Sequence, residues 1–191
     1  MRVIAGLAKK RRLKSPGKLP VRPTSDRVKE ALFNIIVSLV PECDFADLFA
    51  GTGAVGLEAL SRGARKTVFV ENNPQVARIL EDNIALTGLE EGSEIIRRDV
   101  TSALEFMHRR GDKFDIIFAD PPYRQGLAEL TLNTLCRYPV HHQGGVLVIE
   151  TGAGEAVPEK AGFYFMTRRE KYGDTALLFY KHSTEGDKFC E

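Results

Sequence analysis

The chain has 191 residues, 43% of them hydrophobic and 28% charged, which is typical of one medium-sized globular domain with a sizeable core. No run of about 18 apolar residues is present, so we expect no membrane span, and the basic N-terminus lacks the apolar segment of a secretory signal. Three widely spaced cysteines (Cys43, Cys136 and Cys190) argue against a disulfide framework and favour a reducing compartment, the cytoplasm. No close His/Cys cluster suggests a metal, and the adjacent His141 and His142 are interpreted as a surface pair.

The net charge of +1 is unevenly distributed along the chain. Residues 1–30 carry ten basic and two acidic groups, so their local net charge is +8 and the remaining 161 residues carry −7. A basic arm on a mildly acidic body favours a polyanionic partner such as a nucleic acid, and we assign that contact to Lys9, Lys10, Arg11 and Arg12. The alternative interpretation of the same charges is a solvated, disordered tail.

The N-terminal part is expected to contain one loop and one helix. Residues 8–20 combine Lys, Arg, Gly, Pro and Ser with few apolar side chains, which predicts a flexible loop or arm. A choice of N-cap residues at 24–26 and an apolar stripe over residues 28–40 then predict a helix that Pro41 ends.

Strands and helices alternate from residue 44 onward. Strands are predicted over 44–49, 66–71, 94–98, 114–119 and 146–150, and helices over 55–62, 74–87, 103–109 and 127–138. Two further strands, 163–169 and 175–181, flank a hairpin turn at 172–174. This order predicts an α/β, Rossmann-like and mostly parallel sheet with helices on both faces, closed by an antiparallel C-terminal hairpin. We expect a basic extension and helix over 1–40, one domain over 41–182 and a frayed tail over 183–191.

A glycine-rich turn over residues 47–56 (DLFAGTGAVG) joins the first strand of this alternation to its helix. Glycines allow the backbone to turn tightly and to approach a ligand closely, and ligands of such sheets bind beyond the carboxyl ends of the strands. Gly51, Gly53 and Gly56, with Glu71 some 20 residues later, also fit a dinucleotide fingerprint. Taken alone, the turn fits a nicotinamide cofactor as well as S-adenosylmethionine.

Acidic residues follow the next two strands. Glu71, at the end of the second strand, can accept hydrogen bonds from two adjacent ribose hydroxyls. Asp99, just after the third strand, could accept a bond from an adenine amino group, and the amide of Val100 could donate to a ring nitrogen. Each residue also has a purely structural interpretation. Glu71 could be a surface acid at a strand end, and Asp99 could belong to an ordinary charged turn.

The motif Asp120-Pro121-Pro122-Tyr123 follows the apolar strand 114–119 directly. Two prolines remove two backbone donors, so the strand ends in carbonyl oxygens and a carboxylate that can accept the two hydrogens of an amino group. The Tyr123 ring can stack on a base. The motif therefore predicts methylation of an exocyclic amine by direct displacement, driven by positioning and electrostatics. Pro-Pro as a plain loop terminator is the alternative.

The whole set of motifs resembles one family of methyltransferases. DLFAGTGAVGLEALSRGA, VFVEN, RRDV and IIFADPPY are similar to class I S-adenosylmethionine-dependent enzymes that methylate amines. MRVIAGLAKKRRL, RPTSDRVKEALFNII and KYGDTALLFYK resemble the RsmD family, whose members methylate the N2 amine of a guanine in bacterial 16S ribosomal RNA. The resemblance covers residues 1–181.

The resemblance implies a role for each matching residue. The cofactor S-adenosylmethionine would contact Asp47, Phe49, Gly51, Gly53, Gly56, Glu71, Asn72, Asp99 and Val100, and the guanine would contact Asp120, Pro121, Pro122 and Tyr123. Three residues of the N-terminal element, Arg22, Thr24 and Arg27, would border the cofactor or the RNA. The implied partner is 16S ribosomal RNA, within a small ribosomal subunit or an assembly intermediate, and we expect a monomer without metal.

Three alternatives remain open. A DNA adenine-N6 or cytosine-N4 methyltransferase shares the Asp-Pro-Pro-Tyr motif, but DNA-modifying enzymes usually carry a target-recognition domain, for which this chain leaves little room. A nicotinamide-dependent oxidoreductase explains the glycine turn and leaves residues 120–123 without a purpose. A non-catalytic RNA-binding module would need only the basic arm.

Overall fold

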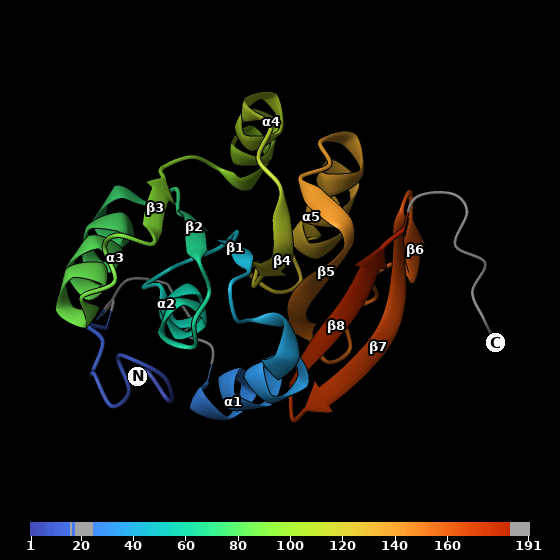
Figure 1. Ribbon diagram of the computed structural model, residues 1–191. Helices are drawn as coiled ribbons and strands as arrows, with labels where there is room; N and C mark the ends of the chain where they lie inside the picture. The colour runs from blue at the N-terminus through green and yellow to red at the C-terminus, as the bar shows by residue number, and fades with distance from the viewer. Residues whose placement is uncertain (16, 18–24, 184–191) are drawn as a thin grey trace.

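The structure is a computed structural model that describes residues 1–15, 17 and 25–183. Within these ranges the strands form one eight-stranded sheet of order β3-β2-β1-β4-β5-β8-β7-β6 (Figure 1). The strands are β1 (Asp44–Asp47), β2 (Lys66–Val70), β3 (Ser93–Ile96), β4 (Phe114–Ala119), β5 (His141–Gly152), β6 (Lys160–Ala161), β7 (Tyr164–Tyr172) and β8 (Thr175–His182). The helices are α1 (Asp26–Ile35), the 3-10 helix η1 (Val37–Leu39), α2 (Ala54–Ser61), α3 (Pro74–Thr87), α4 (Val100–Arg110) and α5 (Leu127–Arg137).

The first five strands are parallel and the last three complete the sheet in antiparallel fashion. Asp47, the last residue of β1, is in register with Phe69 of β2 and Phe118 of β4, so the carboxyl ends of these three strands lie at one edge. β8 runs antiparallel to β5, and β7 runs antiparallel to β8. The predicted fold class, a mostly parallel sheet with an antiparallel C-terminal hairpin, is confirmed.

Alternating strand residues build two cores, one on each face of the sheet. On one face Phe45, Phe69 and Phe118 pack against apolar residues of α1, α2 and α3. On the other face the intervening strand residues, such as Val68 and Ile117, pack against α4 and α5. This period of two follows from the pleat of a strand, in which successive side chains point to opposite faces. Figure 1 shows α4 and α5 grouped apart from α1 and α2.

Several element boundaries differ from the predicted ones. β4 coincides with its prediction, whereas α4 begins at Val100 because the Asp99 side chain caps it by accepting from the Ser102 amide. β5 begins at His141, since that residue pairs with Phe114 of β4 ahead of a register shift. The first helix ends at Ile35 and continues as the short 3-10 helix η1. The two-residue strand β6 was not predicted.

The interpretation of His141 and His142 as a surface pair is wrong for His141. Its side chain is buried, its Nδ1 lies 2.8 Å from the Tyr164 hydroxyl, and its ring lies 5.9 Å from the ring of His182. Because His141 begins β5 between β4 and β8, the pleat turns it into the core, and the exposed neighbour His142 points the other way.

The N-terminal segment is folded onto the body, so the prediction of a flexible arm is wrong for residues 8–14. Arg2 and Arg12 form an antiparallel bridge, which makes residues 2–12 a short hairpin. Val3, Ala8 and Leu13 are buried in the core on the side of α2 and α3. The basic side chains of Lys9, Lys10, Arg11 and Arg12 are exposed, so the hairpin buries its apolar residues and presents its charges to solvent. We refer to residues 1–14 as the N-terminal hairpin.

Within the ranges that the structure describes, no helix is both long and apolar enough to cross a membrane. The same ranges contain no group of three or more His, Cys, Asp or Glu side chains arranged to hold a metal ion.

Candidate cofactor and substrate site

A pocket of about 280 Å³ opens at the carboxyl ends of β1, β2 and β3. Three strand ends, the first turn of α4 and the helix α5 supply its walls: Leu48, Phe49, Val70, Glu71, Asn72, Arg98, Asp99, Val100, Thr101, Leu127, Leu130 and Thr131. Five of the predicted cofactor residues therefore lie together: Phe49, Glu71, Asn72, Asp99 and Val100. The walls combine apolar side chains with carboxylates, which suits a flat heterocycle joined to a hydroxylated sugar.

The sequence did not identify the wall that α5 contributes. Leu127, Leu130 and Thr131 line the pocket from this helix, and Leu130 is 50% exposed. An exposed leucine on an otherwise amphipathic helix is a weak sequence signal, because single apolar residues are common on protein surfaces.

The glycine turn begins α2 with two residues in the left-handed region. Gly51 has φ 54° and Gly53 has φ 84°. A Cβ on Gly53 would lie 2.4 Å from Cδ1 of Leu80, so space and conformation both require glycine there. The Gly53 amide donates to the Ala50 carbonyl at 2.7 Å, which closes the turn tightly.

Glu71 holds this turn from the end of β2. Its carboxylate accepts hydrogen bonds from the amides of Gly51 (3.0 Å) and Asn73 (2.8 Å). Burial raises the pKa of Glu71, whereas these backbone donors act in the opposite direction. Each carboxylate oxygen has a second lone pair, so Glu71 can fix the turn and accept from a ligand at the pocket wall.

Asp47 and Gly56 support the turn from below and are not among the residues that line the pocket. The Gly56 amide donates to Oδ2 of Asp47 at 3.0 Å, while Oδ1 is buried without a hydrogen-bond partner in the described part of the chain. Burial raises the pKa of Asp47 to about 7, and the nearby charge of Glu71 adds to the rise. A Cβ on Gly56 would lie 2.3 Å from the Phe69 ring, so Gly56 allows α2 to pack closely on β2.

Asp99 also has a structural role, as the N-cap residue of α4. Its carboxylate accepts from the Ser102 amide (3.0 Å) and the Ser102 hydroxyl (2.6 Å) as the N-cap of α4. The Ser102 hydroxyl bond lowers the pKa of Asp99, so this carboxylate is held in its charged form. Asp99 still lines the pocket, and the predicted bond to an adenine amine would use a remaining lone pair.

Residues 120–123 form the loop that follows β4, at the same sheet edge as the glycine turn. The Leu48 amide donates to the Phe118 carbonyl at 2.9 Å, which keeps the ends of β1 and β4 adjacent. Asp120 and Tyr123 are half-buried and Pro122 is exposed. The Tyr123 hydroxyl donates to Oε1 of Glu150 at 2.9 Å and lies 3.2 Å from Oγ1 of Thr175. Neither Glu150 nor Thr175 was identified from the sequence, because they lie 27 and 52 residues further along.

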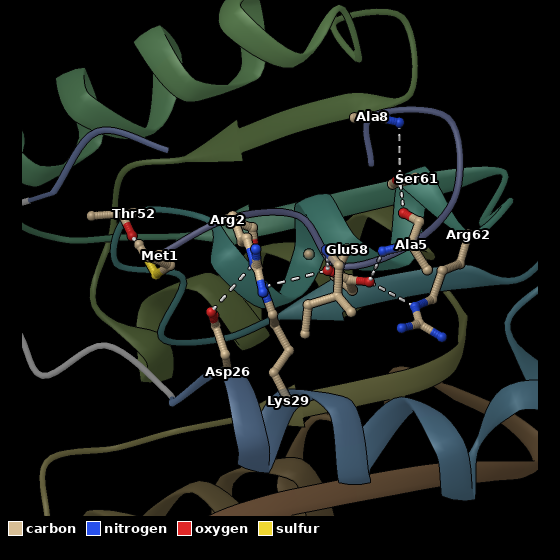
Figure 2. Close-up of polar contacts among 12 residues, drawn as sticks. Met1, Arg2, Ala5, Ala8, Asp26, Lys29, Thr52, Glu58, Ser61 and Arg62 are labelled. Carbon is tan, nitrogen blue, oxygen red and sulfur yellow. Dashed lines mark hydrogen bonds and ion pairs between the residues drawn. The ribbon is translucent and has the colours of Figure 1, made fainter. Parts of the chain in front are cut away.

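Glu58 of α2 anchors the N-terminal hairpin beside the glycine turn (Figure 2). Its carboxylate accepts from the amides of Ile4 (2.7 Å) and Ala5 (3.0 Å) and from Nε of Arg62 (2.8 Å). Nζ of Lys29, from α1, lies 3.4 Å from Oε2 of Glu58. The side chains of Lys29 and Glu58 are completely buried. The N-terminal hairpin, α1 and α2 therefore meet at one buried ion pair.

Further contacts attach both ends of the hairpin to the glycine turn and its neighbours. Lys29 Nζ donates to the Arg2 carbonyl at 2.6 Å, and Oγ1 of Thr52, between the two turn glycines, lies 3.8 Å from Sδ of Met1. The buried Asn83 amide of α3 donates to the carbonyls of Lys14 (3.2 Å) and Thr52 (2.9 Å). The hairpin therefore shares hydrogen-bond partners with the turn that borders the pocket.

The remaining predicted RNA-binding residues are placed only in part. Arg27 lies on α1 with an exposed side chain, whereas Arg22 and Thr24 lie outside the described residues.

Cys43 is buried just before β1, at the opposite end of that strand from the pocket, and burial raises its thiol pKa to about 12. Cys43 is therefore unsuited to act as a nucleophile in the pocket.

Comparison with known proteins finds proteins named as methyltransferases both by sequence and by structure. The chain is 36% identical to a putative rRNA methyltransferase, YlbH, of Bacillus subtilis (strain 168) over 181 residues, 95% of this chain and 98% of the relative. It is 32% identical to ribosomal RNA small subunit methyltransferase D of Escherichia coli (strain K12) over 187 residues, 98% and 92% of the two chains. A solved structure described as putative methyltransferase yhhF from Escherichia coli superposes with a TM-score of 0.81 at 30% identity, covering 97% of this chain and 99% of the other. Residues 1–181 match the family described as conserved hypothetical protein 95. The chain therefore belongs to this family, the RsmD family that its motifs indicated.

Proposed function

We propose that this protein transfers a methyl group from S-adenosylmethionine to the N2 amine of a guanine in small-subunit ribosomal RNA. The observation that carries the proposal is the loop 120–123, an acceptor-rich and aromatic segment at the same sheet edge as the pocket of Glu71 and Asp99. A nicotinamide-dependent oxidoreductase would use the pocket but has no task for this loop.

The residues present fit the proposed cofactor. Glu71 supplies acceptors for the ribose hydroxyls, and Asp99 supplies one for the adenine amine, while Phe49, Val100 and Leu130 offer apolar surface to the adenine ring. Gly51 and Gly53, both at positive φ, present no side chain where the methionine part would pass. S-adenosylmethionine, when bound, supplies an electrophilic methyl group on its sulfonium.

The loop 120–123 would orient the attacking nitrogen. The N2 amine of guanine is a poor nucleophile, because its lone pair is delocalised into the ring. The Asp120 carboxylate and the Pro121 carbonyl would each accept one amine hydrogen, which favours a more tetrahedral nitrogen whose lone pair points at the methyl group. The Tyr123 ring would stack on the base. Asp120 or water would take the proton that the amine releases as S-adenosylhomocysteine departs, and positioning and electrostatics would supply the rate enhancement without a covalent intermediate.

The proposal is tested with small ribosomal subunits from cells that lack this protein. The subunits are incubated with the protein and isotopically labelled S-adenosylmethionine, and the RNA is digested to nucleosides for mass spectrometry. Label in N2-methylguanosine is the expected result. Absence of label from RNA, with label in N6-methyladenine or N4-methylcytosine when DNA is supplied, would instead favour the DNA amino methyltransferase.

The N-terminal hairpin would bind the RNA backbone through Lys9, Lys10, Arg11 and Arg12. Neutralising all four should weaken RNA binding and flatten its salt dependence, because each lost phosphate contact lowers the slope of log K against log salt by about 0.7–0.9. The measurement is a titration of RNA binding at several salt concentrations.

A matched control neutralises four exposed basic residues elsewhere, Arg109, Lys160, Arg168 and Lys171, and so makes the same change in net charge. If the slope of log K against log salt fell equally in both variants, the hairpin would act only through the net charge of the protein and would make no local contact with the RNA.

A further inference from the structure

The ring of Tyr123 is held at its outer end by two buried residues of the antiparallel part of the sheet. Glu150, near the end of β5, and Thr175, the first residue of β8, are 4% and 5% exposed. Their side-chain oxygens lie 2.9 and 3.2 Å from the Tyr123 hydroxyl. Burial raises the pKa of the Tyr123 phenol, which keeps the hydroxyl protonated as the donor to Glu150.

The segment after Glu150 contacts the same loop in two more places. Gly152 faces the ring, since a Cβ built on it would lie 3.5 Å from Cδ2 of Tyr123. Glu155 accepts a hydrogen bond from the Arg124 amide at 3.2 Å. Arg124 has φ 60°, a left-handed conformation that disfavours a non-glycine residue. Strained backbone of this kind persists where surrounding contacts determine it, and it is common at functional sites.

We propose that Glu150 and Thr175 are positioning residues that hold the Tyr123 ring, and with it the loop 120–123, in the arrangement that receives the target base. The proposal rests on the proposed function, in which Tyr123 stacks on the guanine. With its hydroxyl fixed, the ring holds the bound base in the geometry for attack, so a larger share of the bound complexes is ready to react and kcat is higher. The hydroxyl itself takes no part in the transfer.

A double-mutant cycle tests the proposal through Tyr123→Phe, Glu150→Leu, which removes the acceptor, and the variant carrying both changes. Each single change should lower kcat about 10-fold, the loss expected for one hydrogen bond to a charged group. The double variant should be no worse than the poorer single variant, because both changes remove the same contact. The Kd for S-adenosylmethionine should stay unchanged, since neither residue lines its pocket. Additive losses, or losses confined to KM, would overturn the proposal.

Two further measurements separate positioning from general stability and from a failure of the proposed function. Tyr180→Phe removes another phenol bond, to the Pro158 carbonyl at 2.8 Å, and should reduce stability without changing kcat. Thr175→Val should act like Tyr123→Phe, and Thr175→Ser should restore most of the rate. Amide hydrogen exchange at residues 123–126 should be faster in Glu150→Leu than in the wild type, whatever the substrate. Unchanged exchange would overturn the proposal even if wild-type protein did not methylate RNA.

Discussion

Replacing Asp120 with alanine is expected to lower the rate of methyl transfer by about 10²–10³-fold, the cost of removing one preorganised polar group that acts on the reacting atoms. The affinity for S-adenosylmethionine should stay close to that of the wild type, because Asp120 belongs to the loop after β4 and is not among the residues that line the pocket. Single-turnover methylation of RNA measures the first quantity, and calorimetric titration with the cofactor measures the second.

Two control variants refine this prediction. Asp120→Asn keeps one acceptor oxygen and the shape of the side chain, so its rate should lie between those of the wild type and the alanine variant. Glu71→Gln should show the opposite pattern, a raised Kd for the cofactor with a smaller loss of rate at saturation, since Glu71 holds the glycine turn at the pocket wall. Full turnover by Asp120→Ala would mean that the amine is not oriented by this carboxylate.

The features that were predictable from the sequence are those determined by neighbouring residues. β4 was located from its nearly all-apolar run, and the ends of α3 and α4 were located from Gly88 and Gly111, which have φ 72° and 82°. One pocket was also predictable from the strand order, because parallel strands bring the residues after their carboxyl ends to one edge. The predicted residues around it are Phe49, Glu71, Asn72, Asp99 and Val100.

Contacts between distant segments were not predictable in the same way. Residues 8–14 look polar and irregular in sequence, and the order of the N-terminal hairpin depends on acceptors on Glu58, Ser61 and Asn83, which are separated from it by more than 50 residues. The contacts of Glu150 and Thr175 with Tyr123 likewise depend on strand order, with β5 lying between β4 and β8. Local periodicity carries no information about such pairings.

The buried pair Lys29–Glu58 is expected to be the most sensitive point for stability. Lys29→Met should lower the free energy of unfolding by about 1–3 kcal/mol, because the Arg2 carbonyl loses its donor and Glu58 keeps only Arg62 as a cationic partner. The loss should also loosen the N-terminal hairpin, since Lys29 Nζ holds the Arg2 carbonyl. Urea unfolding followed by circular dichroism measures the change, with Lys66→Met as the matched control. Lys66 pairs with Glu94 at 2.6 Å, but its side chain is 43% exposed, so its loss should cost less than about 1 kcal/mol.

The pH dependence of stability provides a second test of the Lys29–Glu58 pair. Burial lowers the pKa of Lys29 against the attraction of Glu58, so in alkaline solution the unfolded chain binds more protons at this position than the folded one. Stability linked to Lys29 should therefore rise with pH up to the ordinary pKa of lysine, about 10.4. That rise should be absent from Lys29→Met and preserved in Lys66→Met. The two variants could instead lose the same free energy of unfolding and keep the same dependence of stability on alkaline pH. That result would show that burial beneath the hairpin does not make the Lys29–Glu58 pair more stabilising than an exposed pair.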